Sequence, residues 1–364
     1  MKVGIETVHD SSNLGSYLQA LGMQELVKEY GDEPYFIKTR SEFSVLCLFM
    51  GYNNAPSVRS LRGFIKFILR SIINFTSIAP KIRKYKRYKN DREKLDNIIS
   101  IKEANRIGLD ILLMGSDEIW NSNQPAFQNP LLYGAEIKAT RKCAYAISVG
   151  NMDAKNWLRY PELLNHIKNL DAIIPRDTRT SELLKDHGLS VEKTVCDPTL
   201  QVDIRRYMAD NFELPKKDYI VVYAYSVGEK MKNNIIRFAA EHALKTVAVS
   251  LPNAWCDEYI NCSPLEFGTI LSGAKYVYTS TFHGTIFSAL YHTNFVSMNK
   301  MPKVAEVVTL MGIDEYAVSD DCEYPDFEQK LLADRNYNEF EDRIKIMKDN
   351  AKEIYMERIK NAMK

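Results

Sequence analysis

Strand-like and helix-like patterns alternate through the first half of the chain. Residues 3–8 have the pattern of a strand, and a polar loop containing Gly15 leads from them into a segment with apolar residues at helical spacing up to Tyr30. Three more strands are expected, at 109–114, 142–149 and 172–175. Because strands and helices alternate, the pattern predicts a parallel sheet in an α/β domain.

The same alternation restarts after Asp197-Pro-Thr-Leu200. Strands are expected at 219–225, 246–251, 276–278 and 295–298, and helices at 235–244 and 264–271. Residues 336–363 have apolar positions near helical spacing and are predicted to form one long amphipathic helix. We therefore expect an α/β protein with two Rossmann-like domains and a terminal helix. The predicted divisions are 1–203, 204–334 and 335–364.

Residues 41–94 depart from this alternation and are interpreted as an insertion in the first domain. Within them, 64–75 and 81–89 are helical in pattern, basic and partly apolar. One interpretation is a solvated helical lid whose apolar side packs on the first domain, and we favour it. The other is contact with anionic phospholipid, or with a polyprenyl-diphosphate-linked substrate, at the inner face of the cell membrane, because basic amphipathic helices bind such groups.

Composition narrows the class of protein. A chain of 364 residues is long enough for two domains, and its 48 lysines and arginines nearly balance its 47 aspartates and glutamates, so no global charge attracts nucleic acid. The six cysteines form no C-x-x-C pair and no zinc-ligand pattern. No apolar run has the length of a signal peptide or of a membrane span, which predicts a cytoplasmic protein.

The candidate for chemistry is His283, in the segment Ser280-Thr-Phe-His-Gly-Thr285. This polar, glycine-containing segment lies between a predicted strand and a helix resuming at Thr285, so His283 is expected in the turn at the carboxyl end of a strand. Ligands bind at that edge of α/β sheets, and helix-terminal N–H groups can hold an anion there. The structural alternative is that His283 only caps or packs the turn.

Two further motifs follow predicted strands in the first half, and a third, at Asp197, lies at the predicted domain boundary. In Gly115-Ser-Asp-Glu-Ile-Trp-Asn121, Asp117 is placed to accept a proton or a sugar hydroxyl and Trp120 to stack on a sugar ring, or else Asp117 caps a helix and Trp120 belongs to the core. Arg176 follows the strand at 172–175, where it is either a clamp for a carboxylate or phosphate or an exposed surface residue. Asp197 is expected to bond nearby backbone.

The absence of several motifs excludes common chemistries. The sequence has no P-loop, no H-E-x-x-H, no G-x-S-x-G and no convincing G-x-G-x-x-G, so nucleotide hydrolysis, zinc proteolysis and serine esterase chemistry lose support.

Five motifs, taken in order, resemble the polysaccharide pyruvyl transferase family. They are Asn13-Leu-Gly-Ser-Tyr-Leu-Gln19, Gly115-Ser-Asp-Glu-Ile-Trp-Asn121, Arg176-Asp with Ser181, Asp197-Pro-Thr-Leu200 and Ser280-Thr-Phe-His-Gly-Thr285. The resemblance implies a GT-B-like fold, in which two Rossmann-like domains face a cleft and a C-terminal helix crosses back to the N-terminal domain, which is expected on the acceptor side.

The resemblance also implies a reaction and a set of site residues. Phosphoenolpyruvate would donate pyruvate to two hydroxyls of a sugar in a surface-glycan precursor, giving a cyclic ketal and phosphate, with no metal or redox cofactor. His283 would be the general acid, Arg176 the donor clamp and Asp117 the group that orients or deprotonates the acceptor, while N–H groups near Gly284 and Thr285 complete an anion site. The other expected substrate-site residues are Asn13, Gly15, Ser16, Tyr17, Gln19, Gly115, Ser116, Trp120, Asn121, Asp197, Ser280, Thr281 and Phe282.

One departure from the family pattern affects this expectation. Several members carry an arginine two residues before the histidine, where this chain has Thr281. Either Arg179 or Lys303 replaces the missing donor contact, or this branch of the family uses a changed donor or a different chemistry. Two rival functions stay open at this point: a GT-B glycosyltransferase that uses a nucleotide sugar, and a non-catalytic glycan-binding relative.

Overall fold

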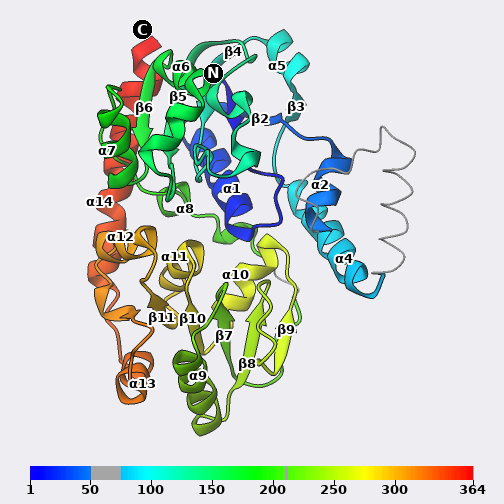
Figure 1. The fold of residues 1–364 in the computed structure, drawn as a ribbon, viewed down its shortest axis with the longest axis vertical. Coiled ribbons are helices and arrows are strands. Elements are labelled where there is room, and N and C mark those ends of the chain that lie inside the picture. Colours follow the sequence, from blue (N-terminus) through cyan, green and yellow to red (C-terminus); the bar gives the residue numbers. More distant parts are fainter. Residues whose placement is uncertain (51–74, 210–211, 364) are drawn as a thin grey trace. The chain divides into compact units, whose positions relative to one another are not determined.

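The computed structural model describes residues 1–50, 75–209 and 212–363. The chain divides into two compact units. Unit 1 contains Met1–Ile204 and Met347–Lys364, and unit 2 contains Arg205–Ile346. Each unit has its own parallel sheet with helices packed on it (Figure 1), so the predicted α/β class is confirmed.

The sheet of unit 1 has six strands among the described residues, all paired in parallel, in the order β3-β2-β1-β4-β5-β6. Their bounds are β1 (Lys2–Glu6), β2 (Glu33–Lys38), β3 (Ile98–Ser100), β4 (Leu109–Met114), β5 (Ala139–Ile147) and β6 (Ala172–Pro175). Leu112 and Ile147 are among the fully buried apolar residues that join the sheet to its helices. Because all the strands are parallel, their carboxyl ends meet at one edge, where the motifs of the first half lie.

Seven α-helices of unit 1 lie within the described residues before residue 204. They are α1 (Leu14–Glu29), α2 (Glu42–Phe49), α4 (Phe75–Arg92), α5 (Ile101–Ile107), α6 (Pro161–Lys168), α7 (Thr178–Asp186) and α8 (Pro198–Gln201). Short 3-10 turns lie between them: η1 (Pro125–Phe127), η2 (Pro130–Tyr133) and η3 (Ala154–Arg159). Asn13 caps α1, since its side chain accepts a hydrogen bond from the N–H of Gly15.

The sheet of unit 2 repeats this architecture with the strand order β12-β11-β10-β7-β8-β9 in the described part of the chain. The strands are β7 (Tyr219–Tyr223), β8 (Lys245–Val249), β9 (Glu258–Ile260), β10 (Tyr276–Thr279), β11 (Asn294–Met298) and β12 (Ala317–Val318). The helices are α9 (Glu229–Glu241), α10 (Pro264–Ser272), α11 (Phe282–Leu290), α12 (Pro302–Leu310) and α13 (Tyr324–Leu332), with 3-10 turns η4 (Arg205–Tyr207) and η5 (Asp314–Tyr316). A buried cluster that includes Phe238 and Phe327 packs helices on one face of this sheet.

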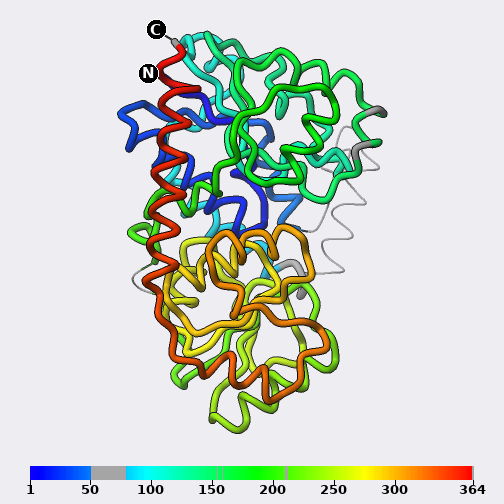
Figure 2. The backbone as a smooth tube through the Cα atoms, turned by 90° about the vertical axis from the view of Figure 1, so that its left-hand side faces the viewer, coloured from blue at the N-terminus to red at the C-terminus, as the bar shows by residue number. Residues whose placement is uncertain are grey.

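The C-terminal segment returns to unit 1, with its end near the N-terminus (Figure 2). It contains α14 (Asn338–Tyr355), a π-helical turn (Met356–Lys360) and a 3-10 turn (Asn361–Met363) without a break between them. The long helix predicted over 336–363 is therefore confirmed from Asn338 on, and its last turns change from α to π and 3-10 geometry. The ammonium of Lys360 lies 3.1 Å from the carboxylate of Asp32, which also pairs with the amino group of Met1 at 3.0 Å. These ion pairs hold both ends of the chain in unit 1.

The described part of the 41–94 insertion packs on unit 1 through α4. Tyr88 is buried and its hydroxyl donates to the carbonyl of His9, while the hydroxyl of Tyr17 donates to the carbonyl of Asp91 at 2.5 Å. The predicted helix at 81–89 is confirmed within α4, whereas 64–74 lies outside the described residues. In the described ranges, no helix combines the length and the apolar character needed to cross a membrane.

Candidate active site

The motif after β4 places Asp117 beside the first turn of α1. The hydroxyl of Ser16 donates to one carboxylate oxygen of Asp117 at 2.6 Å, and the other oxygen accepts the N–H of Glu118 at 2.8 Å. Two predicted site residues that are 101 positions apart in the chain therefore meet at the sheet edge. Asp117 is partly exposed, so its carboxylate is both held in place and accessible to solvent.

Gly115 is required by the backbone at this edge. Its φ is +121°, and a Cβ atom there would collide with the carbonyl of Tyr145 on the neighbouring strand. The glycine thus lets β4 turn sharply into the segment that carries Ser116 and Asp117.

Arg176, the first residue after β6, forms a buried ion pair with Asp197. Its guanidinium donates to the Asp197 carboxylate at 3.0 Å, and the hydroxyl of Ser116 reaches the same oxygen at 3.4 Å. Burial alone would lower the pKa of Arg176, but Asp197 and then Asp117 act in the opposite direction and the pKa is raised. The alternative that Arg176 is an exposed surface residue is wrong, because only 6% of its surface is accessible to solvent.

Asp197 has a second structural task at the start of α8. Its other carboxylate oxygen accepts hydrogen bonds from the N–H and the hydroxyl of Thr199, at 3.0 and 2.7 Å. This agrees with the backbone-bonding role expected for Asp197 and fixes the carboxylate that faces Arg176.

Trp120 is a core residue in this structure. It has no exposed surface, its indole N–H donates to the carbonyl of Leu132 at 3.0 Å, and its ring stacks on Tyr133. The proposal that it stacks on a sugar ring is therefore corrected, because close packing leaves no free face. The sequence could not separate these alternatives, since a tryptophan after a buried strand suits both.

Several other predicted substrate-site residues of unit 1 are also enclosed. Tyr17 and Gln19 have no exposed surface, and Asn121 bonds Glu118 and Asn151 through its amide nitrogen. The Gln19 amide donates to the carbonyls of Val8 and Ser16 and so fixes the loop before α1. These three side chains are therefore part of the packing behind the sheet edge.

Two titratable residues at the same edge were not predicted. Glu6, the last residue of β1, is fully buried and neither of its carboxylate oxygens has a hydrogen-bond partner in the described structure. Burial, and then the nearby charge of Asp10, raise its pKa well above the usual value. His9 is equally buried, and burial lowers its pKa. The only sequence signal for Glu6 was that a charged residue ends an apolar strand. A charged residue at such a position can equally be exposed.

In unit 2, His283 lies in the first turn of α11 and not in a loop before it. Thr281 is the N-cap, and its hydroxyl accepts the N–H of Gly284 at 3.0 Å. The helix therefore begins three residues earlier than expected. The imidazole is half-buried and makes an edge contact with Phe282, with 5.2 Å between ring centroids. His283 is thus at the carboxyl end of β10, as predicted, but on a helical backbone.

Gly284 is the position at which the helix meets β7 and β10. A Cβ atom there would collide with the hydroxyls of Thr279 and Thr281 and with the ring of Tyr223. The N–H of Gly284 bonds the Thr281 hydroxyl, and that of Thr285 bonds the Thr281 carbonyl at 3.1 Å. The expected anion site on these two N–H groups is therefore corrected, because the helix itself uses them.

A pocket of about 330 Å³ lies at the same sheet edge of unit 2. Ser280 contributes to it from the end of β10, and the remaining walls come from the segments after β7, β11 and β12. Its lining residues are Tyr225, Ser226, Val227, Gly228, Ser280, Met298, Lys300, Met301 and Asp320.

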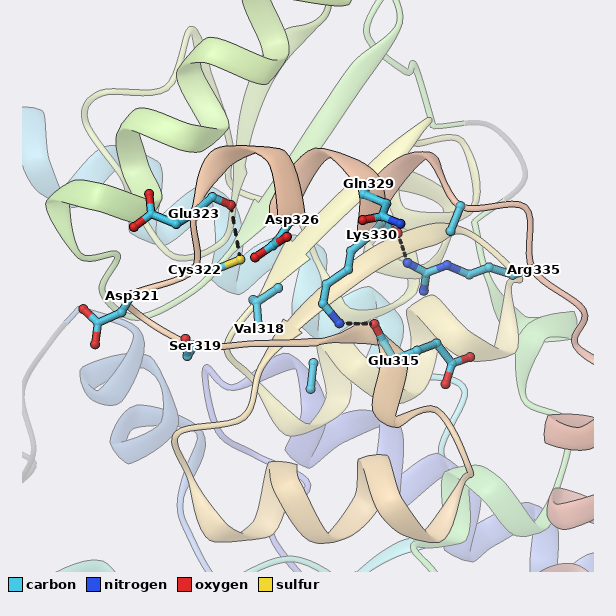
Figure 3. Close-up of a pocket in the computed structure, with 12 residues that line it drawn as sticks. Glu315, Val318, Ser319, Asp321, Cys322, Glu323, Asp326, Gln329, Lys330 and Arg335 are labelled. Atoms are coloured by element: carbon cyan, nitrogen blue, oxygen red, sulfur yellow. Dashed lines mark hydrogen bonds between the residues drawn. The ribbon is translucent and has the colours of Figure 1, made fainter.

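A second pocket, of about 600 Å³, lies at the outer strand β12 and helix α13 (Figure 3). Its lining includes the carboxylates of Asp321, Glu323 and Asp326. The amino group of Lys330 donates to the carbonyl of Glu315 at 2.7 Å, and the guanidinium of Arg335 lies over the ring of Tyr316. None of the predicted site residues lines this pocket.

Comparison with known proteins identifies the family. A family model for polysaccharide pyruvyl transferases matches residues 13–299, most of the chain. The chain belongs to this family. The match spans all five motifs, from Asn13 to Thr285, and makes the protein a member of a transferase family.

Solved structures support the two-unit fold of this pyruvyl transferase family member. The MnaA–UDP co-structure from S. aureus covers 100% of this chain and 96% of its own, with 10% identity and a TM-score of 0.50. The match to the structure of a UDP-N-acetylglucosamine 2-epimerase covers 98% of this chain and 95% of the epimerase chain, with 11% identity and a TM-score of 0.52. At this identity the likeness concerns the fold alone, and it agrees with the GT-B-like expectation. No curated protein sequence matches.

Proposed function

We propose that the protein transfers pyruvate from phosphoenolpyruvate to two hydroxyls of one sugar in a surface-polysaccharide precursor. The observation that carries the proposal is the family match over 13–299, which includes His283 and its helix-capping segment. The structure supports it by placing this imidazole, half-buried, at the carboxyl edge of a parallel sheet, where ligands of α/β proteins bind.

The proposed reaction balances without an oxidant or reductant. The methylene carbon of the donor gains a proton, which makes its neighbouring carbon electrophilic, and one sugar hydroxyl adds to that carbon. The bond between this carbon and the phosphate oxygen then breaks, and the second hydroxyl completes the ketal. Of the two hydroxyl protons, one balances the proton given to carbon and the other leaves on phosphate. The only co-substrate is phosphoenolpyruvate.

His283 is proposed to supply the proton to carbon, because an imidazole transfers protons near neutral pH. Asp117 is proposed to orient or deprotonate an acceptor hydroxyl, and its bond from Ser16 holds the carboxylate for that task. Arg176 is proposed to attract the donor's carboxylate or phosphate while it shares its charge with Asp197.

A donor labelled with ¹⁸O at its bridging oxygen tests this proposal. The purified protein is incubated with labelled phosphoenolpyruvate and lipid-linked or soluble glycans, and phosphate and glycan are analysed by mass spectrometry. We expect the label in the phosphate and the mass gain of a pyruvate ketal on the glycan. If only nucleotide sugars stabilise the protein in thermal-shift assays and transfer a sugar, the glycosyltransferase alternative is correct.

The basic helix α4 supports a proposal about location. Lys81, Arg83, Lys86 and Lys89 are exposed, whereas Tyr88 and Arg92 face unit 1. We propose that this exposed basic side attracts the protein to anionic headgroups at the cytoplasmic face of the membrane, where lipid-linked acceptors are found. Flotation with vesicles of phosphatidylserine and phosphatidylcholine tests this: a variant with Lys81, Lys86 and Lys89 changed to Gln should float less. Equal flotation would reject the proposal.

A further inference from the structure

The 330 Å³ pocket of unit 2 has an aromatic wall that the sequence analysis did not identify. Tyr225, two residues after the end of β7, retains 65% of its exposure and lines the pocket. The chain directly before it is anchored, since the Tyr223 carbonyl accepts the N–H of Ser280 at 3.3 Å and the Ala224 carbonyl accepts the amide of Asn253 at 3.1 Å. A large exposed ring beside an anchored segment is typical of a binding surface.

The rest of the pocket combines apolar and hydroxyl-binding groups. Met298 and Met301 supply soft apolar surface, and Ser226 and Ser280 supply hydroxyls. The amino group of Lys300 lies 2.9 Å from the carboxylate of Asp320. This pair presents both a donor and an acceptor to a ligand.

The charge and the size of the pocket limit what it binds. Among the described residues that line it, Lys300 and Asp320 are the charged ones and carry opposite signs. They therefore offer no net attraction to a multiply charged anion such as phosphoenolpyruvate. Its volume of about 330 Å³ is at the lower end of the range for small-molecule sites, roughly 300 to 1,000 Å³. A single uncharged ring suits these limits better than a nucleotide sugar.

We propose that this pocket is a further subsite, on unit 2, for one sugar ring of the acceptor glycan, in addition to the acceptor contact proposed for Asp117 of unit 1. The ring would have its apolar face on Tyr225 and its hydroxyls on Asp320, Lys300 and the two serines. The proposal rests on the proposed function and deepens it. Ser280 directly precedes the Thr281 cap of the helix that carries His283, so the pocket and the imidazole share the end of β10. The subsite replaces the sugar-stacking role that Trp120 cannot fill.

Sugar binding without any donor tests the subsite separately from turnover. Saturation-transfer difference NMR is measured with the methyl glycosides of glucose, galactose, mannose and N-acetylglucosamine on the wild type and on Tyr225→Ala and Tyr225→Phe. We expect saturable binding to the wild type, affinity within about twofold for Tyr225→Phe, which keeps the ring, and at least about tenfold weaker binding for Tyr225→Ala. Tyr259→Ala, which changes another exposed tyrosine of unit 2, is the matched control and should bind like the wild type.

The outcomes separate the two proposals. Equal binding to wild type and Tyr225→Ala, or no saturable binding of any of the four glycosides to the wild type, would overturn the subsite. Loss of binding in the Tyr259→Ala control would overturn it as well. Sugar binding that depends on Tyr225, without phosphate release from phosphoenolpyruvate, would leave the subsite in place and reject pyruvyl transfer.

Discussion

The guanidinium of Arg176 donates to the carboxylate of Asp197 across 3.0 Å, and both side chains are almost completely enclosed. Ser116 approaches the same carboxylate from the segment after β4. The pair therefore joins the ends of β4 and β6 and the start of α8 at one edge of the sheet. Because it is buried, each partner leaves an uncompensated charge if the other is removed.

Removal of one member of this pair should cost more stability than removal of both. We expect Arg176→Met to lower the free energy of unfolding by about 3 to 5 kcal/mol, and Arg176→Met combined with Asp197→Asn to cost less than that. Lys230→Met, which breaks the exposed pair with Glu323, is the control and should cost less than about 1 kcal/mol. Guanidinium unfolding curves provide the measurement. A double variant that is less stable than Arg176→Met would contradict this account.

Replacement of His283 should affect the rate of the chemical step more than the stability of the fold. If the imidazole transfers a proton, His283→Gln should lower kcat by on the order of a hundredfold or more while the unfolding midpoint changes little. Phosphate release from phosphoenolpyruvate, measured at saturating acceptor, tests this. His242→Gln, which alters another histidine of unit 2 that bonds Glu328, should keep kcat. An unchanged kcat in His283→Gln would reject the proton-transfer role.

The buried carboxyl group of Glu6 should make stability depend on pH. The pKa of Glu6 in the folded protein is raised above the usual value of 4.5. Its contribution to the free energy of unfolding is therefore fully present below about pH 4.5 and is lost as the pH rises through the folded-state pKa. We expect Glu6→Gln to remove this loss and to stabilise the protein at pH 8 by more than about 1 kcal/mol. Unfolding curves between pH 5 and pH 8, with the exposed Glu93→Gln as control, measure the difference. A Glu6→Gln protein that is less stable than the wild type at pH 8 would contradict the burial argument.

The start of α11 should tolerate little change. Thr281→Ala removes the cap of this helix and should cost about 1 kcal/mol, whereas Thr281→Ser keeps the hydroxyl and should cost less. Gly284→Ala should cost about 1 to 3 kcal/mol, because its methyl group meets Thr279 and Tyr223. Thermal unfolding of the three variants ranks them. If the Gly284→Ala protein is as stable as the Thr281→Ser protein, α11 can move away from Thr279 and Tyr223 at little cost, and the prediction is contradicted.

The apolar periodicity predicted the buried strands best. β4 and β6 have the predicted bounds, 109–114 and 172–175, because each is a short apolar run that ends at a polar motif. β2, β3, β9 and β12 were not predicted, since these strands near or at the sheet edges are short or partly polar and carry a weak pattern.

The site was predicted less completely than the fold, for a physical reason. Sequence motifs placed Asp117, Arg176 and His283 at strand ends. The bond from Ser16 to Asp117 and the pair of Arg176 with Asp197 join residues that are 101 and 21 positions apart in the chain, and they depend on tertiary packing. His283 was expected in a turn because of the adjacent Gly284. In the structure that glycine allows close packing of a helix, and Thr281 starts the helix earlier.

The return of residues 347–364 to unit 1 separates the two stretches of this unit in the order of synthesis. Unit 2 is one continuous stretch, Arg205–Ile346, whereas unit 1 needs Met347–Lys364 as well as everything before Ile204. The second stretch of unit 1 is therefore synthesised only after all of unit 2, and it carries Lys360, whose ammonium lies 3.1 Å from the carboxylate of Asp32 in the first stretch.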